Sequence, residues 1–402
     1  MSGPDASWIG PPPSLTQRLA VLWIGIVGVL FPGVGPLLLG GLEAAGRLTA
    51  SEIGLAGMAE LAAMGIGAAL LGPVFGARRL RPAAVACGCF LAALNLASTF
   101  AHDGLLVLTR AAAGLPAGAL IWIVTGMIVR SPRPDRWSGV YLTVQTLAQL
   151  AVVAGLTVFV IGQFGPNGGF MALAGVLIPR AWAALPRTED APKGLPSPRG
   201  WVALLAVFCF QAFILALWIY AEPLSRQAGH PATTAGLAFS ISLAAQVAGG
   251  AAATALAGRV SWFVSLTGGV CAAAACLVIF AALPTVPLFL AASGLFGFAW
   301  LFASPFLTPL AIEADPSRRA ALLGPGASLL GCAAGPLLAA LIVGEHDVRA
   351  AAHLAQALAV VTLALIGGLH LTRRKDHRAK STTPDAIPLD KAKLGIASPP
   401  DL

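Results

Sequence analysis

Charged residues are scarce in this sequence of 402 residues. Asp, Glu, Lys and Arg together make up 10% of it, whereas hydrophobic residues make up 57% and the mean hydropathy is +0.83. Soluble domains carry about 25% charged residues. The composition therefore excludes a single soluble core and favours a chain that lies mostly in lipid.

Motifs for enzyme chemistry and metal binding are also missing. The six cysteines form no Cys-x-x-Cys pair and have no histidine at ligand spacing, and neither His-Glu-x-x-His nor Gly-x-Ser-x-Gly occurs. A nucleotide-binding loop is absent too. We therefore expect no metal, no cofactor, no intramembrane enzyme and no ATP-driven pump. The cysteines are expected to be small core residues.

Long apolar runs, separated by short polar or basic segments, are what the sequence has in abundance. Their lengths are close to the roughly 20 residues that cross a bilayer as a helix. We expect an all-α membrane protein with twelve transmembrane helices. They are predicted at about residues 19–42, 53–76, 83–101, 105–129, 138–161, 170–185, 201–222, 232–257, 263–282, 288–312, 320–343 and 351–372.

The polar segments divide the chain into two halves of six helices. Residues 186–200 are rich in proline and charge, so we expect a loop there, between an N-terminal half at 19–185 and a C-terminal half at 201–372. A polar lead at 1–18 comes before the first run, and no small-residue cleavage site ends that run, so we expect the run to be retained. The polar tail at 373–402 is expected to be disordered.

The basic residues are spread unevenly over the loops. With the expected helices, 21 Lys and Arg residues lie on the side of the two termini and the central loop, against three on the other side. The positive-inside rule then places both termini and the central loop in the cytoplasm, for a multi-pass protein of a bacterial inner (plasma) membrane. Because the basic residues fill the gaps between apolar runs, we expect them to meet lipid and no nucleic acid.

The two halves contain similar segments. GLAGMAELAA at 54–63 matches GLAFSISLAA at 236–245, and AAGLPAGA at 112–119 matches ASGLFGFA at 292–299, at offsets of 182 and 180 residues. Two matches at nearly one offset favour duplicated six-helix halves. With cytoplasmic termini and a basic central loop, the sequence resembles the major facilitator superfamily over about residues 19–372. The resemblance implies two pseudo-symmetric halves, with the first, fourth, seventh and tenth helices around a central cavity.

One motif of the resemblance lies in the loop after the second run. GPVFGARRLRP stands where the superfamily has Gly-x-x-x-Asp-Arg-x-Gly-Arg-Arg at a cytoplasmic gate. Gly72 and Arg81 match this pattern, whereas Gly76 stands at the aspartate position and Arg79 at the second glycine.

Two further motifs lie inside helices. In the fourth run, Arg110-x-x-x-Gly114-x-x-x-Gly118 is similar to the superfamily's arginine motif, which is linked with proton coupling. In the eleventh run, Gly331-x-x-x-Gly335-Pro336 is similar to a signature associated with antiporters, which in that family stands in the fifth. The motifs therefore leave the direction of transport open.

Arg110 and Glu60 are charged residues inside expected helices. Arg110 lies about five residues, or roughly 8 Å, from the outer end of its helix, and an arginine at a helix centre costs about 2.5–3.5 kcal/mol. Either Arg110 faces the cavity, to bind an anionic solute or tune a nearby acid, or it reaches out to the membrane surface and anchors its helix. Glu60 lies at a similar depth, so the two are able to pair. It is then a proton carrier, or else a protonated or helix-capping glutamate.

The remaining candidates stand on helices that the resemblance places around the cavity. Glu222 is a second candidate for the proton-responsive acid, the alternative being a solvated helix end. Aromatic faces with few hydrogen-bonding groups suit a small amphipathic or aromatic solute better than a sugar, although tryptophans also collect at membrane interfaces. The set comprises Trp122, Gln211, Trp218, Tyr220 and Trp300.

These features together predict a secondary transporter. We expect it to move a small organic solute, aromatic or anionic, by alternating access coupled to protons, and to act as a monomer. The alternative is a proton-driven efflux pump for hydrophobic drugs or metabolites. Both are built in the same way and differ in direction.

The topology is testable with a cysteine placed at Lys193 in the central loop. We expect an impermeant maleimide to leave this residue unlabelled in intact cells and to label it after permeabilisation, since the loop is predicted to be cytoplasmic. The parent protein gives the background from the native cysteines. Labelling of Lys193→Cys from outside contradicts the predicted orientation.

Overall fold

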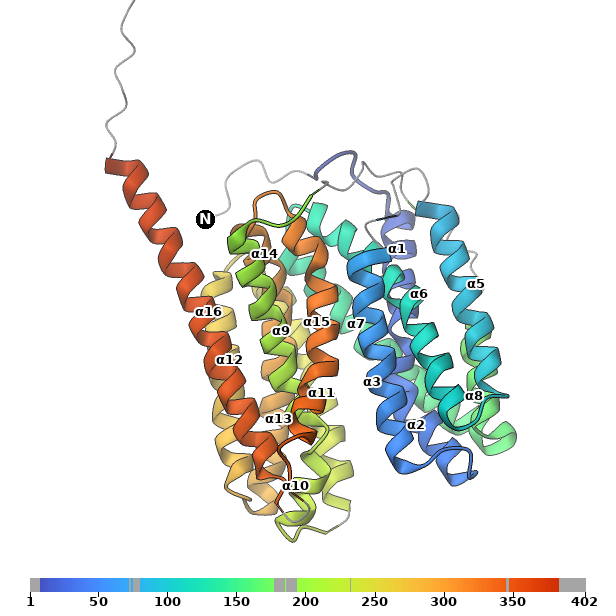
Figure 1. The fold of residues 1–402 in the computed structure, drawn as a ribbon. Coiled ribbons are helices and arrows are strands. Elements are labelled where there is room, and N and C mark those ends of the chain that lie inside the picture. The colour runs from blue at the N-terminus through green and yellow to red at the C-terminus, as the bar shows by residue number, and fades with distance from the viewer. Residues whose placement is uncertain are drawn as a thin grey trace, which may run out of the picture.

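The computed structural model describes residues 8–71, 74, 80–176, 185, 194–231, 233–344 and 347–382, and its regular elements are helices. Gly72, Gly76, Arg79 and Lys193 lie outside these residues. The helices stand side by side in two adjacent groups (Figure 1). The first group contains α1 (Leu15–Gly28), α2 (Leu30–Ala44), α3 (Ala50–Ile66), η1 (Gly67–Leu71), α5 (Leu80–Ser98), α6 (Asp103–Arg130), α7 (Pro134–Gly155), η3 (Leu156–Ile161) and α8 (Gly162–Val176).

The second group follows after the central loop. It contains α9 (Pro198–Trp218), α10 (Ala221–Gln227), α11 (Thr233–Leu256), α12 (Trp262–Ala281), α13 (Val286–Ala303), η5 (Ser304–Phe306), α14 (Leu307–Ala314), α15 (Arg319–Ala340) and α16 (Arg349–Thr382). Each group has its own hydrophobic core. The groups meet chiefly through α3 against α15 and α7 against α11. This is the expected architecture of two six-helix halves, called the N-half and the C-half below.

The helices are long and apolar enough to cross a membrane. Eleven continuous stretches meet this criterion among the described residues, and one of them, Pro134–Val176, has 43 residues. As a straight helix it would measure about 65 Å, twice the hydrocarbon core of a bilayer. It turns instead at Gly165, where φ is +63°. The chain then returns to the start of α5, where the Arg81 Nε donates to the Leu185 carbonyl at 2.9 Å. The stretch therefore accounts for two crossings and the total of twelve.

The sixth helix begins earlier in the chain than the sequence predicts. The apolar pattern places it over 170–185, whereas α8 begins at Gly162 and contains the turn at Gly165. Pro166 follows that turn, and a proline is well placed in the first turn of a helix because the missing N–H has no partner there anyway. Residues 177–184 lie outside the described part of the chain.

Prolines break two helices that the sequence suggests are continuous. The first span separates into α1 and α2 at Val29, whose φ and ψ are −111° and 9°. Pro32 lacks an N–H, and its ring crowds the carbonyl four residues earlier. Gln149 from α7 donates to the Val29 carbonyl at 2.6 Å. In the same way, the tenth span passes through the 3₁₀ turn η5 at Pro305.

The predicted disordered tail is wrong in its first ten residues. α16 continues beyond residue 372 to Thr382 and rises above the neighbouring helices (Figure 1). No proline or glycine occurs between residues 373 and 382, and the basic residues there are good helix formers. Residues 383–402 lie outside the described part of the chain.

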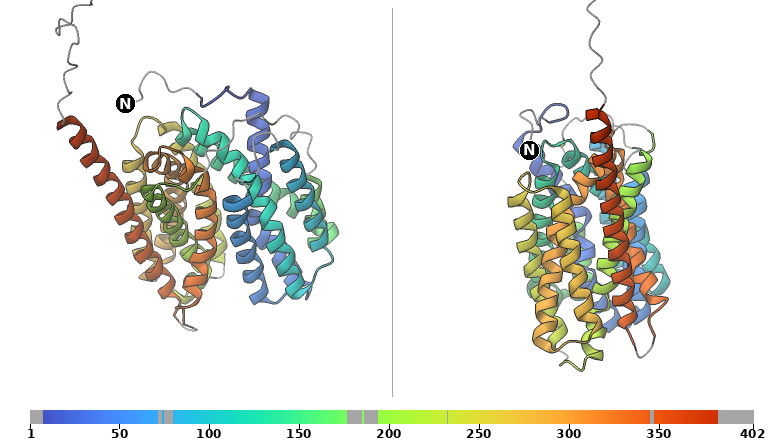
Figure 2. Two further views of the ribbon diagram at one scale, coloured as in Figure 1. Left: turned by 45° about the horizontal axis from the view of Figure 1, so that its top comes forward. Right: turned by 90° about the vertical axis from the view of Figure 1, so that its left-hand side faces the viewer.

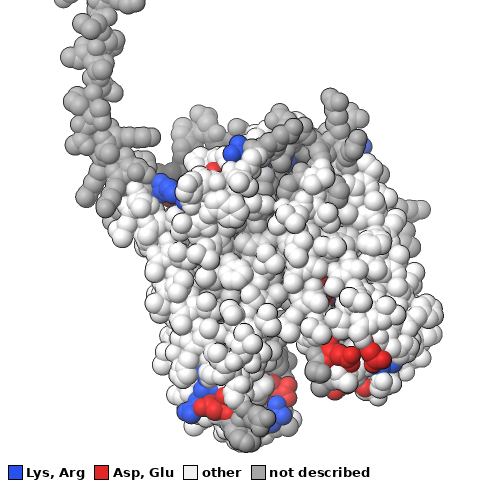
Figure 3. Space-filling model, viewed as in Figure 1, with Lys and Arg blue, Asp and Glu red and all other residues white. Residues whose placement is uncertain are grey.

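The described chain starts and ends at one end of the bundle. The beginnings of α1 and α9 and the last turn of α16 all lie at this end, which we call the terminal end (Figure 1, Figure 2). The other end is called the distal end. Acidic and basic side chains gather at both ends, and the face between them is almost free of charge (Figure 3). This belt is the surface that lipid is expected to cover.

The glycines of the two helix motifs lie where helices touch closely. A Cβ on Gly114 would clash with the carbonyl of Glu60, and one on Gly118 with the carbonyl of Met64, so both let α6 approach α3. Gly331 and Gly335 likewise lie against carbonyls of α9. Small residues at such contacts are the usual means of helix association in lipid. Next to Gly335, Pro336 is buried within α15.

Alanine at Gly118 should therefore destabilise the protein. The added methyl group pushes α6 from α3, and overpacking costs about 1–3 kcal/mol, so we expect a melting temperature several degrees lower in detergent. Gly57→Ala is the matched control, because its Cβ would meet no atom within 4 Å and alanine favours the helix. Equal melting temperatures for Gly118→Ala and Gly57→Ala would contradict the packing role.

Candidate functional site

Arg110 and Glu60 form an ion pair inside the N-half. The Arg110 Nη2 lies 2.7 Å from the Glu60 Oε1, and the Nε donates to the Oε2 at 3.0 Å. The two side chains are 0% and 2% exposed. Parallel bonds between a guanidinium and a carboxylate fix the orientation of both groups. The pair that the depths of the two residues allow is thus present, and Arg110 does not reach the membrane surface.

Other helices of the N-half complete the shell around the guanidinium. Its Nη1 donates to the Asn95 Oδ1 at 2.8 Å and to the Ser98 Oγ at 3.3 Å, both from α5. The ring of Phe31 from α2 covers it, with the guanidinium carbon 3.7 Å from the ring centroid, and Phe170 from α8 stacks on Phe31. A cation over an aromatic face gains about 2 kcal/mol when it is desolvated. Arg110 therefore contacts its own half and does not face an open cavity.

Four members of this shell were not among the residues predicted from the sequence. Asn95 was detectable in principle, because an amide inside an apolar run requires a partner. Ser98, Phe31 and Phe170 carry no such signal, since serine and phenylalanine are common in membrane helices. Their role follows from helix packing alone.

A second arginine links helices by hydrogen bonds at the distal end of the same half. Arg47, which follows α2, donates to the Asn167 Oδ1 at 2.7 Å, to the Ser98 carbonyl at 3.1 Å and to the Ala101 carbonyl. Ser98 thus binds Arg110 through its hydroxyl and Arg47 through its carbonyl. These contacts tie α2, α5 and α8 together, so the distal end of the N-half is expected to move as one body.

The two halves touch at the terminal end. The Arg318 guanidinium donates to the Val129 carbonyl at the end of α6, and the Gly258 N–H donates to the Asp135 Oδ2 at 2.7 Å. Closer to the bundle centre, Ser138 and Thr308 share a hydrogen bond of 3.1 Å. At the distal end the two halves are parted (Figure 3). The structure is therefore closed at the terminal end and open at the distal end.

A polar and aromatic cluster joins α9, α13 and α15 of the C-half. The Gln211 Nε2 donates to the Ser328 Oγ at 2.8 Å, and the Trp300 Nε1 donates to the Gln211 Oε1 at 3.2 Å. The rings of Trp218 and Trp300 meet edge to face with centroids 5.9 Å apart. All four side chains are partly exposed. Three predicted candidates, Gln211, Trp218 and Trp300, are thus brought together.

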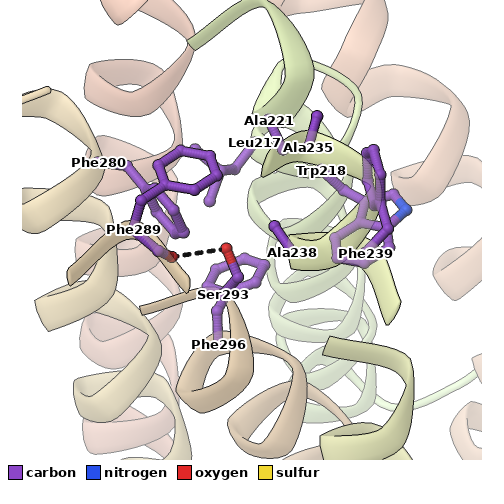
Figure 4. Close-up of a pocket in the computed structure, with 10 residues that line it drawn as sticks. All are labelled: Leu217, Trp218, Ala221, Ala235, Ala238, Phe239, Phe280, Phe289, Ser293 and Phe296. Carbon is purple, nitrogen blue, oxygen red and sulfur yellow. Dashed lines mark hydrogen bonds between the residues drawn. The ribbon is translucent and has the colours of Figure 1, made fainter. Parts of the chain in front are cut away.

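A small apolar pocket lies beside this cluster, with Trp218 in its wall (Figure 4). Among its lining side chains only Ser293 and the Trp218 indole carry polar atoms, and the Ser293 hydroxyl is satisfied by the Phe289 carbonyl at 2.8 Å. The lining comes from α9 to α13 and comprises Leu217, Trp218, Ala221, Ala235, Ala238, Phe239, Phe280, Phe289, Ser293 and Phe296. Aromatic walls with so few polar groups favour an apolar occupant.

The other candidates lie apart from both clusters. Trp122 is buried in the core of the N-half, and its indole N–H has no hydrogen-bond partner among the described residues. Tyr220 is partly buried against the core of the C-half. Glu222 is exposed in α10 at the distal end. Their expected place around the cavity rested on the resemblance to the superfamily.

An exposed ion pair gives a contrast to Arg110 and Glu60. The Nη2 of Arg349, the first residue of α16, lies 2.8 Å from the Oδ2 of Asp347 in the preceding loop, and both side chains are nearly half exposed. Hydrogen bonds from Arg349 and Gln227 hold the pKa of Asp347 well below its usual range. Because water screens this pair, its contribution to stability is expected to be small.

Removing one partner of the buried pair should be worse than removing both. Arg110→Ala or Glu60→Ala alone leaves an unpaired charge in the N-half, which costs about 3–5 kcal/mol. The double variant leaves none, so we expect its melting temperature and yield to recover in part. Arg349→Ala is the control for loss of a solvent-exposed pair. Additive losses in the double variant would contradict a direct interaction.

Comparisons with known proteins agree with the fold and the two halves. The family model of the Major Facilitator Superfamily matches residues 20–324. The crystal structure of the transporter FucP in the outward conformation aligns with a TM-score of 0.69 at 13% identity, over 88% of this chain and 98% of that one.

Two further structures align about equally well. The human organic anion transporter MFSD10 (TETRAN) has a TM-score of 0.70 at 18% identity, over 89% of this chain and 100% of that one. A single-residue variant of the Escherichia coli fucose:proton symporter FucP has a TM-score of 0.67 at 14% identity, over 88% and 97%. No curated protein matches by sequence alone. The family model covers most of the sequence, and the chain belongs to the Major Facilitator Superfamily.

Proposed function

We propose that the protein is a proton-coupled transporter of a small amphipathic solute with an aromatic or other apolar group. Membership of the superfamily supports a secondary transporter. The solute, the coupling to protons and the direction of transport are our proposals. Their physical basis lies in two separate clusters, one in each half.

The buried bidentate pair between Glu60 and Arg110 is the observation that carries the proposal. Carboxylates inside membrane helices commonly mark proton relays. A proton on Glu60 would neutralise the partner of Arg110 and leave the guanidinium to Asn95, Ser98 and the ring of Phe31. The strength of the contact between α3 and α6 would then depend on protonation.

The pair is close to a contact between the halves. Gly65 lies five residues after Glu60 on α3, or about 7.5 Å along the helix. A Cβ on Gly65 would clash with Leu330 of α15, so α3 and α15 are in tight contact there. A shift of α3 against α6 on protonation would therefore change the contact between α3 and α15. This contact must loosen when the terminal end opens.

The cluster in the C-half supports the choice of solute. Gln211 and Ser328 offer an amide and a hydroxyl, and Trp218 and Trp300 offer aromatic faces that bind planar or apolar groups. So few polar groups suit a sugar poorly, although a structural neighbour is a fucose:proton symporter. That symporter and the organic anion transporter support proton coupling and an organic solute in general terms.

The proposal is testable in proteoliposomes loaded with the pH dye pyranine. We expect small aromatic acids or amines, but not L-fucose, to evoke a proton flux. Glu60→Gln should reduce that flux at least about tenfold, because the carboxyl can no longer take up and release a proton. Arg110→Lys should also reduce it strongly, since a lysine cannot make the two-pronged bond.

Glu222→Gln is the matched control, because Glu222 is an exposed carboxylate at the distal end. Full gradient-driven flux in Glu60→Gln would contradict the coupling role, and loss in Glu222→Gln alone would move it to that residue. The efflux alternative uses the same two clusters and differs in direction. Vesicles of both orientations distinguish uptake from efflux, through the side at which the solute evokes the flux.

A further inference from the structure

The loop between α14 and α15 belongs to the C-half and contacts the N-half at the terminal end. Asp315 ends α14, and Arg318 precedes the first residue of α15. Arg318 is partly buried, and its guanidinium donates to the carbonyl of Val129 in the last turn of α6. An arginine at the carboxyl end of a helix also interacts favourably with the helix dipole. The contact therefore joins the N-terminus of α15 to the C-terminus of α6 across the halves.

The backbone of Arg318 is in an unfavourable conformation. Its φ and ψ are 63° and 8°, the left-handed region that residues with a side chain rarely adopt. Such a residue persists only where its surroundings hold it, and strain of this kind is often found at switch regions. A glycine at this position would adopt the same conformation without this strain.

Asp315 holds the loop in this shape. The side chain is 3% exposed, and its Oδ2 accepts from the Ala320 N–H at 3.0 Å, while its Oδ1 accepts from the Ser317 Oγ at 2.7 Å. The Arg318 N–H donates to the Asp315 carbonyl at 2.8 Å. Gly200 of α9 packs against the Asp315 side chain. The base of the loop is thus fixed to the C-half, and the Arg318 side chain reaches from it to the N-half.

The N-half presents a rigid acceptor to this side chain. The carbonyl of Arg130, next to Val129, accepts from the Ile9 N–H at 3.0 Å, so the end of α6 is capped from both sides. Pro134 at the start of α7 limits the freedom of the short connection. The Val129 carbonyl is therefore held in place, and the two halves need to separate by only a small distance to break the contact.

We propose that Arg318 is the latch that holds the terminal end closed, with Asp315 positioning it, so that its release shifts the transporter towards the state open at the terminal end. This inference rests on alternating access but not on the identity of the solute or of the coupling acid.

The neighbouring Arg319 provides a matched control. It is also a partly buried arginine, but it donates to the Leu195 carbonyl in the central loop at 3.1 Å and not to the N-half. Its removal eliminates the same charge at the same end of the molecule without removing the contact to Val129.

The latch is tested by the distance between spin labels at Arg136 and Val264. These residues lie near the terminal end, one in each half, and both are exposed. The full chain in nanodiscs carries labels on a background in which the six native cysteines are replaced. We expect Arg318→Ala to raise the ratio of open to closed molecules about 5–30-fold, the effect of losing one charge-assisted hydrogen bond. Arg319→Ala should leave the ratio unchanged.

Arg318→Gly distinguishes the effect of the side-chain contact from that of the backbone strain, because Arg318→Ala removes only the contact. Arg318→Gly removes the latch contact and relaxes the left-handed backbone, so we expect it to open the terminal end as Arg318→Ala does. A distance distribution like that of the parent protein in both variants, or an equal opening in Arg319→Ala, would overturn the latch. Melting temperatures close to that of the parent exclude unfolding as the cause. Because neither solute nor proton gradient is present, failure of the proposed transport function would leave this result untouched.

Discussion

The ion pair between Arg110 and Glu60 is the interaction on which the N-half depends. Two opposite charges in an apolar interior are tolerable only when each satisfies the other, and here the guanidinium also finds partners on α5. The pair joins α3 and α6, and the ring of Phe31 adds α2. A single proton on the Glu60 carboxylate would neutralise one partner of the ion pair that joins these helices. The proposed coupling follows from this placement.

The two halves differ at this position although their sequences contain matching segments. The matches place Ser242 at the position of Glu60 and Leu290 at that of Arg110. Ser242 is fully buried, and its hydroxyl has no partner among the described residues. The C-half instead carries the Gln211 and Trp300 cluster. This division is the basis for assigning proton uptake to the N-half and solute contact to the C-half.

The closed end is made from loops that correspond to one another in the two halves. The last turn of α6 supplies the Val129 carbonyl, the first turn of α7 supplies Asp135, and the connection after α14 supplies Arg318. Among the described residues, these polar contacts add to the packing of α3 against α15 and of α7 against α11. The free-energy difference between the two open states is expected to be small. A small difference is what a transporter requires, because each state must be reached in every cycle.

Much of the fold was predictable because lipid imposes a simple rule on sequence. Each crossing requires an apolar run of sufficient length, and the distribution of arginines indicates the number of crossings. The proximity of Glu60 and Arg110 was suggested by their similar depth.

The breaks at Val29 and η5 were less evident, since proline is common in membrane helices without breaking them. Phe31 and Phe170 are ordinary apolar residues until packing places them beside a cation. The left-handed backbone at Arg318 was not predictable either, because such a conformation is usually indicated by a glycine and this position holds an arginine. Which end is closed reflects a small difference in free energy between two arrangements of the same helices, so no local pattern indicates it.

If protonation of Glu60 decides which end of the transporter is open, as we propose, the two ends must respond to pH in opposite directions. Distances between spin labels at Leu105 and Leu288, both exposed near the distal end, and at Arg136 and Val264 near the terminal end measure the two openings together. Between pH 8 and pH 5 we expect them to change in opposite directions in the parent protein and in Glu222→Gln, and to stay constant in Glu60→Gln. Distances in Glu60→Gln that follow pH as in the parent protein would contradict the account.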